Sequence, residues 1–140
     1  IITMSLFLGN SAFANELLKL RCVPQNPKLD TINWLLDLKQ KRVIERGVFQ
    51  VNFPLKVSSS TIAWVETTRQ KIKGITTLFE FSYEKKSKIL RTFVYQLNNV
   101  QVNQFSKDLR REYSKTGDKV SSSLAALTKY KGIKVTYNCE

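Results

Sequence analysis

Two runs of alternating apolar and polar residues, joined by a short charged segment, form the clearest pattern in this chain, within residues 76–97. Alternation with a period of two is typical of strands, because successive side chains point to opposite faces. The segment therefore predicts a β-hairpin with residues 84–88 as its turn. Phe79, Phe81 and Tyr83 share one face of its first strand, and we expect further strands to cover these rings.

The same alternation recurs on both sides of this hairpin. It predicts a first strand at 18–22, a second hairpin over 34–53 with its turn at 39–42, a strand at 61–68 and a last strand at 133–139. Together these runs predict about six strands in antiparallel succession.

The period changes after the central hairpin. Phe105 begins an i, i+4, i+8 series of apolar residues, which predicts an amphipathic helix over 103–113. A second helical spacing runs over 120–130, with a serine run near its start as N-cap candidates and Gly132 suited to its end. We expect one or two helices before the last strand.

This order of elements predicts a mainly β protein with minor α content. A parallel α/β fold would need a helix between successive strands, and the chain lacks that arrangement. We therefore expect one domain, built as an antiparallel β-meander or a small barrel-like sheet.

Residues 1–14 are uncharged and mostly apolar, and they end in Ala12, Phe13 and Ala14. An apolar segment before an A-x-A site is typical of a secretory signal peptide. The alternative is a buried strand or a short helix. The first interpretation predicts a signal peptide truncated at its front, an exported domain at 15–140 in the periplasm or medium, and no transmembrane anchor.

Two cysteines, Cys22 and Cys139, lie near the ends of the expected domain. An even count in an exported protein favours a disulfide over a metal site or a catalytic thiol. Both residues continue the apolar face of their predicted strands, so both sulfurs are expected to point inward. Two unpaired buried thiols are the alternative.

Several segments together resemble a family of small exported bacterial proteins whose function is generally unknown. The resemblance lies in LDLKQKRV at 36–43, TIAW at 61–64, FSYEKKSKIL at 81–90 and the terminal cysteines. It implies a β-meander and export, and it transfers no catalytic residue. The chain departs from the family pattern in its central turn and in the additional helical stretch at 103–131.

Catalytic chemistry finds little support in the sequence. The chain has no histidine, which removes the commonest general base and most zinc sites. Glu80 and Glu84 share a strand face, but a solvated polar face explains them better than a glycosidase-type acid pair. We expect a protein that is not an enzyme and that uses neither a metal nor a cofactor.

Charge is the strongest functional signal, because 23 Lys and Arg residues outnumber 11 Asp and Glu residues, giving a net charge of +12. Such a protein attracts anionic surfaces. The candidate contact residues are Lys85, Lys86 and Lys88 in the predicted turn, with Arg110 and Arg111 farther along the chain. The alternative is that these charges only reflect composition and solubility.

These observations predict an exported binding or structural domain whose partner is an anionic envelope surface or another protein. Export disfavours a nucleic-acid partner. Two alternatives remain at this stage: a small barrel that binds an apolar ligand, and a hydrolase of envelope polymers.

Overall fold

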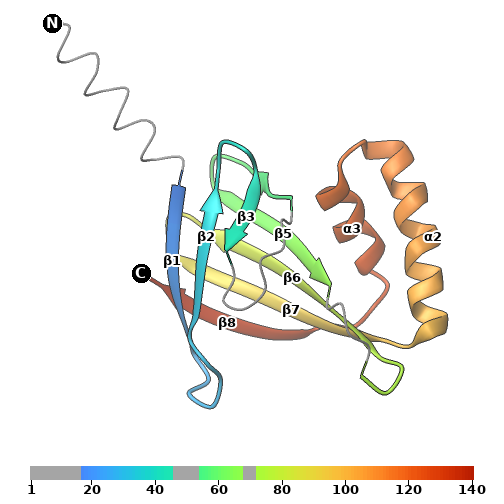
Figure 1. The fold of residues 1–140 in the computed structure, drawn as a ribbon, viewed down its shortest axis with the longest axis horizontal. Helices are drawn as coiled ribbons and strands as arrows, with labels where there is room; N and C mark the ends of the chain where they lie inside the picture. Colours follow the sequence, from blue (N-terminus) through green and yellow to red (C-terminus); the bar gives the residue numbers. More distant parts are fainter. Residues whose placement is uncertain (1–16, 46–53, 68–71) are drawn as a thin grey trace, which may run out of the picture.

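The computed structural model describes residues 17–45, 54–67 and 72–140 (Figure 1). The predicted signal peptide at 1–14 lies outside them, as does the 46–53 part of the second predicted hairpin. The strands are β1 (Leu17–Pro24), β2 (Ile32–Asp37), β3 (Arg42–Glu45), β4 (Lys56–Val57), β5 (Thr61–Thr67), β6 (Thr76–Glu84), β7 (Ile89–Leu97) and β8 (Ile133–Cys139). The helices are α2 (Asn99–Thr116) and α3 (Lys119–Leu127).

All the strands belong to one antiparallel sheet, in the order β3-β2-β1-β8-β7-β6-β5-β4. The sheet curls until its two outer strands approach each other: Arg42 bridges to Pro54, and the Leu55 N–H donates to the Lys41 carbonyl at 2.8 Å. The sheet is a curled half-barrel whose outer edges touch at these residues, which confirms the mainly β antiparallel class.

The expected strand number was wrong, because the described residues contain eight strands instead of about six. Two of the eight are short. β3 has four residues and β4 has two. A two-residue strand shows no alternation, so a pattern of period two cannot reveal it.

Aromatic rings fill the interior of the curled sheet. Phe81 on β6 lies 4.9 Å, between ring centroids, from both Trp34 on β2 and Trp64 on β5. β2 and β6 are separated by three strands in the sheet, so this contact crosses the interior. The strands thus cover the aromatic face of the central hairpin, as the sequence predicts.

The helices cover the opposite, outer face of β5, β6 and β7 (Figure 1). Leu78, Tyr95 and Leu97 point to this face and pack with Phe105 of α2 and Leu127 of α3. One face of β7 thus contributes to the core inside the half-barrel, and its other face contributes to the core beneath the helices.

The helix boundaries follow local capping. Asn98 and Gln101 form a capping box at the start of α2, which begins before the predicted residue 103. Asp118, ahead of the serine run, caps α3 through its hydrogen bond from the Val120 N–H. Gly132 lies beyond the end of α3, where a Cβ would come within 2.9 Å of the Tyr95 ring. Glycine is therefore required here by the close contact with the Tyr95 ring, and not by the end of a helix.

Cys22 and Cys139 form a disulfide between β1 and β8, as the sequence predicts. They stand directly opposite each other, and Cys22 is fully buried. Among the described residues, no helix combines the length and the apolar character needed to cross a bilayer.

Candidate basic binding surface

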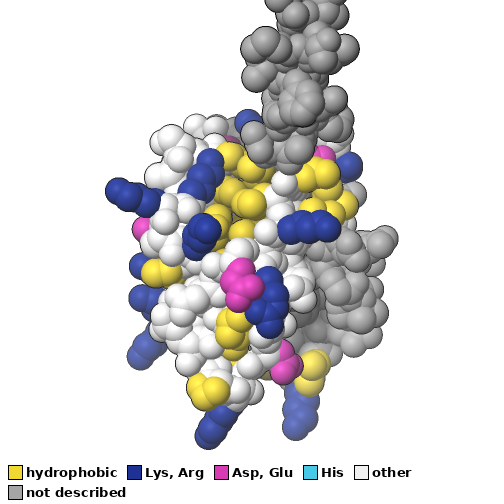
Figure 2. All heavy atoms as spheres, turned by 90° about the vertical axis from the view of Figure 1, so that its left-hand side faces the viewer, with side chains coloured by type: hydrophobic (Ala, Val, Ile, Leu, Met, Phe, Trp, Pro, Cys, Tyr) yellow, Lys and Arg dark blue, Asp and Glu magenta, His cyan; other side chains and the backbone are white. Residues whose placement is uncertain are grey.

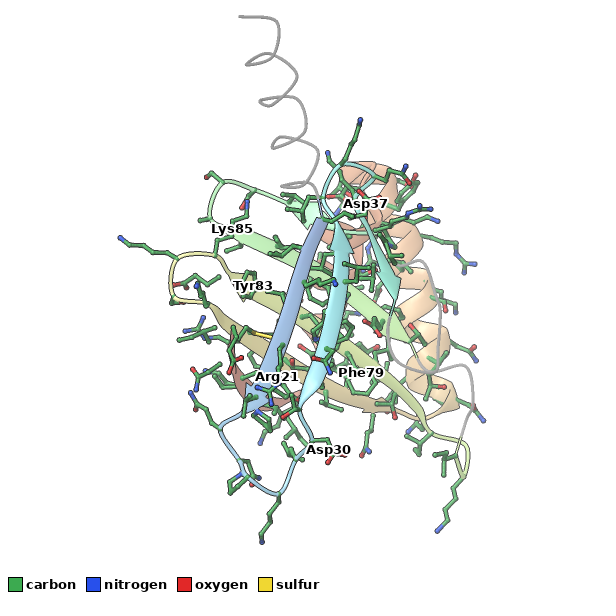
Figure 3. All side chains as sticks on the ribbon, turned by 60° about the vertical axis from the view of Figure 1, so that its left-hand side comes forward. Arg21, Asp30, Asp37, Phe79, Tyr83 and Lys85 are labelled. Carbon is green, nitrogen blue, oxygen red and sulfur yellow. A yellow bond between two sulfur atoms is a disulfide. The ribbon has the colours of Figure 1, made fainter. Side chains whose placement is uncertain are left out.

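Three turns meet at one end of the half-barrel, which we call the turn end: residues 38–41, 58–60 and 85–88. The Lys85 N–H donates to the Ser60 carbonyl at 2.9 Å, which joins two of these turns. Asp37 orders a third, because its Oδ1 accepts a hydrogen bond from the Gln40 N–H at 3.0 Å. Figure 3 shows Asp37 and Lys85 toward this end and Asp30 toward the other.

The turn end is rich in lysine. Lys85 has a structural contact as well, since its Nζ donates to the Ser58 carbonyl at 2.8 Å. Lys41, Lys86 and Lys88 are exposed. The lysines of the three turns are Lys39, Lys41, Lys85, Lys86 and Lys88. Four of the five are exposed and Lys85 is half-buried, so together they place positive charge at the surface of the turn end.

Two of these lysines occupy backbone positions that disfavour them. Lys41 has φ 54° and Lys88 has φ 58°, both in the left-handed region. A residue with a Cβ costs about 1–2 kcal/mol there, whereas glycine avoids the clash and asparagine is tolerated. Folding alone therefore favours glycine or asparagine at both positions.

The structure separates the five predicted anion-contact residues into two groups. Lys85, Lys86 and Lys88 lie at the turn end, while Arg110 and Arg111 lie on α2, at the other side of the molecule (Figures 1 and 3). Arg111 belongs to an ion cluster, since its Nη2 lies 2.7 Å from Oδ1 of the buried Asp108. Only the lysine group therefore forms part of this site.

Asp108 joins the two helices. Its Oδ2 lies 2.5 Å from Lys129 Nζ, just beyond α3, and Oδ1 accepts hydrogen bonds from Arg111 and Gln104. The bond from Lys129, aided by those from Gln104 and Arg111, holds the pKa of Asp108 below its ordinary value of 3.8 although burial acts in the opposite direction. This cluster holds α2 against the end of α3.

Sequence reasoning missed Lys41, which the fold brings to the same end as Lys88. The signal was present, because in an up-and-down meander alternate turns lie at the same end of the sheet. The turn after β2 and the turn after β6 are related in this way.

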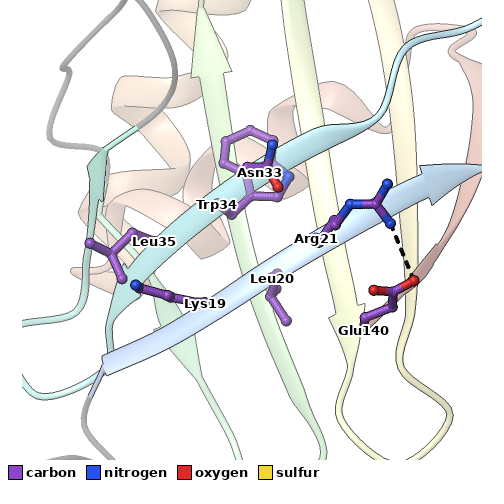
Figure 4. Close-up of a pocket in the computed structure, with 7 residues that line it drawn as sticks. All are labelled: Lys19, Leu20, Arg21, Asn33, Trp34, Leu35 and Glu140. Carbon is purple, nitrogen blue, oxygen red and sulfur yellow. Dashed lines mark hydrogen bonds and ion pairs between the residues drawn. The ribbon is translucent and has the colours of Figure 1, made fainter.

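An open depression lies over β1 and β2, beside the turn end (Figure 4). Its volume is about 550 Å³. Arg21 at its rim pairs with Glu140, with 3.2 Å between Nη1 and Oε1. The lining residues are Lys19, Leu20, Arg21, Asn33, Trp34, Leu35 and Glu140. Figure 2 shows this side of the molecule, with hydrophobic side chains gathered between Lys and Arg side chains.

The geometry offers little to acid–base chemistry. Glu80 and Glu84 are four residues apart on one strand, which separates their backbones by about 13 Å at ~3.3 Å per residue. Glycosidase pairs lie roughly 5–9.5 Å apart. Glu84 already pairs with Arg91, at 3.6 Å, and burial raises the pKa of Glu80 above its ordinary value of 4.5. The two carboxylates thus act separately.

Within the described residues, no three His, Cys, Asp or Glu side chains gather as a metal site would require. A second depression of about 170 Å³ lies between the helices and β5–β6, lined by residues such as Val65, Leu78 and Phe105. It is smaller than the roughly 300–1,000 Å³ usual for small-molecule pockets.

Comparison with known proteins identifies no relative of this chain. No family model, no curated protein sequence and no solved structure matches the chain.

Proposed function

We propose that the protein is an exported, non-enzymatic binding domain that contacts an anionic surface of the cell envelope through the lysines of its turn end. The observation that carries this proposal is the placement of Lys41 and Lys88 at left-handed backbone positions. Selection for folding would favour glycine or asparagine there. Lys73, in the turn before β6, has φ 54° as well, so the gathering of lysines at the turn end, together with this conformation, supports a use for their charge besides folding.

Export is supported by the Cys22–Cys139 disulfide, since disulfides persist mainly in oxidising compartments. A non-enzymatic role is supported by the separation of Glu80 from Glu84 and by the absence of histidine from the sequence. The alternative of an apolar ligand inside the barrel has less support, because Trp34, Trp64 and Phe81 pack against one another across the interior.

The test is binding to vesicles that contain anionic phospholipid, with the double variant Lys41→Asn, Lys88→Asn. Asparagine tolerates both backbone positions, so the fold is kept while two charges are lost. A lysine near an anionic surface contributes about 1 kcal/mol, so the variant should bind roughly 30-fold more weakly at low salt. Wild-type binding should also fall steeply as salt is added.

The matched control is Lys28→Ser, Lys134→Ser, which removes the same charge away from the turn end. Lys28 lies between β1 and β2 at the opposite end, and Lys134 lies on β8. The control should bind within a few fold of wild type. Equal losses in the two variants would show that net charge alone matters, and an absence of wild-type binding at low ionic strength would refute the proposal outright.

A further inference from the structure

β1 extends beyond the strand that pairs with it. Its residues Leu17 to Cys22 pair with β2 along their whole length, but β8 pairs with β1 only from Cys22 to Pro24. The final backbone contact is the Glu140 N–H, which donates to the Arg21 carbonyl at 2.9 Å. Among the described residues, the 17–20 segment of β1 therefore has one unpaired edge, about 13 Å long at ~3.3 Å per residue.

The alternating direction of the backbone groups along β1 shows which of them face the open edge. The carbonyl of Arg21 points toward β8. Gln25, an even number of residues farther along, also faces β8, because its N–H donates a hydrogen bond to the Thr136 carbonyl. Alternate residues of a strand direct their N–H and C=O to the same side. The N–H and C=O groups of Leu17 and Lys19 therefore point to the open edge.

Side chains beside this edge differ between its two faces. Lys19 and Arg21 lie on the outer face, while Leu18 and Leu20 face the interior and contact its core. The turn with Lys86 and Lys88 lies across the open edge, because the Lys88 carbonyl accepts the Cys139 N–H at 2.8 Å. Figure 4 shows Lys19, Leu20 and Arg21 along β1, with Glu140 beside Arg21.

The net charge around the edge is positive. Glu140 is paired with Arg21, and Glu84 is paired with Arg91 at 3.6 Å. These two carboxylates are thus compensated, and a third, Asp37 opposite Leu17, is buried and accepts the Gln40 N–H. Lys19 and Lys86 remain exposed to solvent. An acidic partner would complete the charge balance, and an apolar side chain would cover Leu18.

We propose that the free edge of β1 binds an extended acidic peptide segment as an added strand in line with β8. Main-chain hydrogen bonds to Leu17 and Lys19 supply affinity, and the faces supply specificity. The segment alternates acidic residues, which lie beside Lys19, with apolar residues, which lie on the half-buried Leu18. This partner goes beyond the proposed surface contact, because it uses the strand edge instead of the turn lysines.

The test uses a synthetic peptide of about six residues, the usual strand length, that alternates acidic and valine residues. A second peptide replaces the acids with glutamine, and a third has the same composition in two blocks. The wild-type chain should prefer the acidic alternating peptide to the glutamine form by up to about fivefold, the range of a cross-strand ion pair. The block peptide should not bind.

Two substitutions separate the backbone from the charge. Lys19→Pro removes an N–H that faces the open edge, so the β1–β2 ladder is kept while affinity for both alternating peptides falls at least about fivefold. Lys19→Ser keeps the N–H and should lose only the preference for the acidic peptide. Lys28→Ser, a charge-matched control, should behave as wild type.

Hydrogen exchange gives a readout that does not depend on these variants. The Lys19 amide should exchange quickly in the free protein and slow when the acidic peptide binds, whereas the Leu18 amide, which faces β2, should not change. A Lys19 amide already protected without peptide, or protected by anionic vesicles alone, would overturn the proposal. Unchanged vesicle binding by Lys19→Pro is expected, so failure of this proposal is distinguishable from failure of the surface contact.

Discussion

Lys88 shows how a single residue can depart from what folding alone favours. It closes the β6–β7 turn with its N–H donating to the Glu84 carbonyl at 2.9 Å, and it does so at φ 58°. The turn needs a left-handed residue at this position, and lysine is a costly choice for it. Lys41 in the β2–β3 turn and Lys73 in the turn before β6 have the same conformation.

We therefore expect Lys88→Gly to stabilise the protein. Relief of the left-handed clash contributes about 1 kcal/mol or slightly more, reduced in part by the greater entropy of glycine in the unfolded chain. Denaturant unfolding, followed by tryptophan fluorescence, measures this difference. The same substitution at Lys86, which lacks a positive φ, should leave stability unchanged or lower it. A destabilised Lys88→Gly variant would mean that the lysine side chain contributes to the fold.

Predictions from the sequence at the residue scale succeeded where few alternatives existed. The pairing of Cys22 with Cys139 was predicted from the even cysteine count, the inward face of both residues and the expectation of export, and the structure contains this disulfide. The left-handed position of Lys88 could not be read from the sequence, because lysine gives no signal for positive φ. The role of Gly132 was also hidden, since it depends on the Tyr95 ring, which is distant in sequence.

Strands and helices were predictable in proportion to their length. The nine-residue strands β6 and β7 have clear alternation, whereas the two residues of β4 have none. The helical period revealed α2 and α3, but their starts depend on Asn98 and Asp118. Asp118 also lies 3.9 Å from Lys56 Nζ, which links α3 to β4.

Asp118 should therefore contribute to stability mainly as a helix cap. Its Oδ1 accepts the Val120 N–H at 3.0 Å, so Asp118→Ala is expected to cost about 1 kcal/mol. Asp118→Asn keeps a capping oxygen and should cost clearly less, although it loses the ion pair with Lys56. Thermal unfolding of the three proteins at neutral pH provides the comparison. Equal losses in the two variants would assign the contribution to charge instead of capping.

The effect should also depend on pH. Hydrogen bonds from Ser121 and the Val120 N–H, with the nearby Lys56 ammonium, hold the pKa of Asp118 below its ordinary value of 3.8. The unfolded state therefore takes up a proton first as pH falls. The stabilisation by the carboxylate is fully present above pH 3.8 and is lost below it, so wild type and Asp118→Asn should converge in acid.

At the scale of the whole molecule, the half-barrel has a strong part and a weak part. β6 and β7 are joined by nine residue pairs, whereas β1 and β8 are joined by three. The meander predicted from the sequence already includes the pairing of consecutive strands such as β6 and β7. It could not predict the contact of residues 41–42 with residues 54–55, or the edge of β1 that the described residues leave unpaired, because both depend on how far each strand extends in space.

The Cys22–Cys139 disulfide reinforces the weak part. It joins residues 117 apart in sequence, and closing so long a loop stabilises the native state by about 4–5 kcal/mol in the chain-entropy model. Reduction, or the double substitution Cys22→Ala, Cys139→Ala, should therefore lower the free energy of unfolding by an amount of this order. Denaturant unfolding of the oxidised, reduced and substituted proteins measures the loss.

Loss of the disulfide should also act locally, because β1 and β8 are then held by a short ladder of three residue pairs with one backbone hydrogen bond at each end. Amide exchange of Val23, in that short ladder, is expected to accelerate more than exchange of Phe81 in the central hairpin, which keeps its neighbours on both sides. Hydrogen exchange on the oxidised and reduced chain compares the two positions directly. If both amides accelerate equally, opening is global and the β1–β8 joint is no weaker than the rest. An unchanged unfolding midpoint after reduction would show that packing around the β1–β8 pair holds the fold closed without the covalent link.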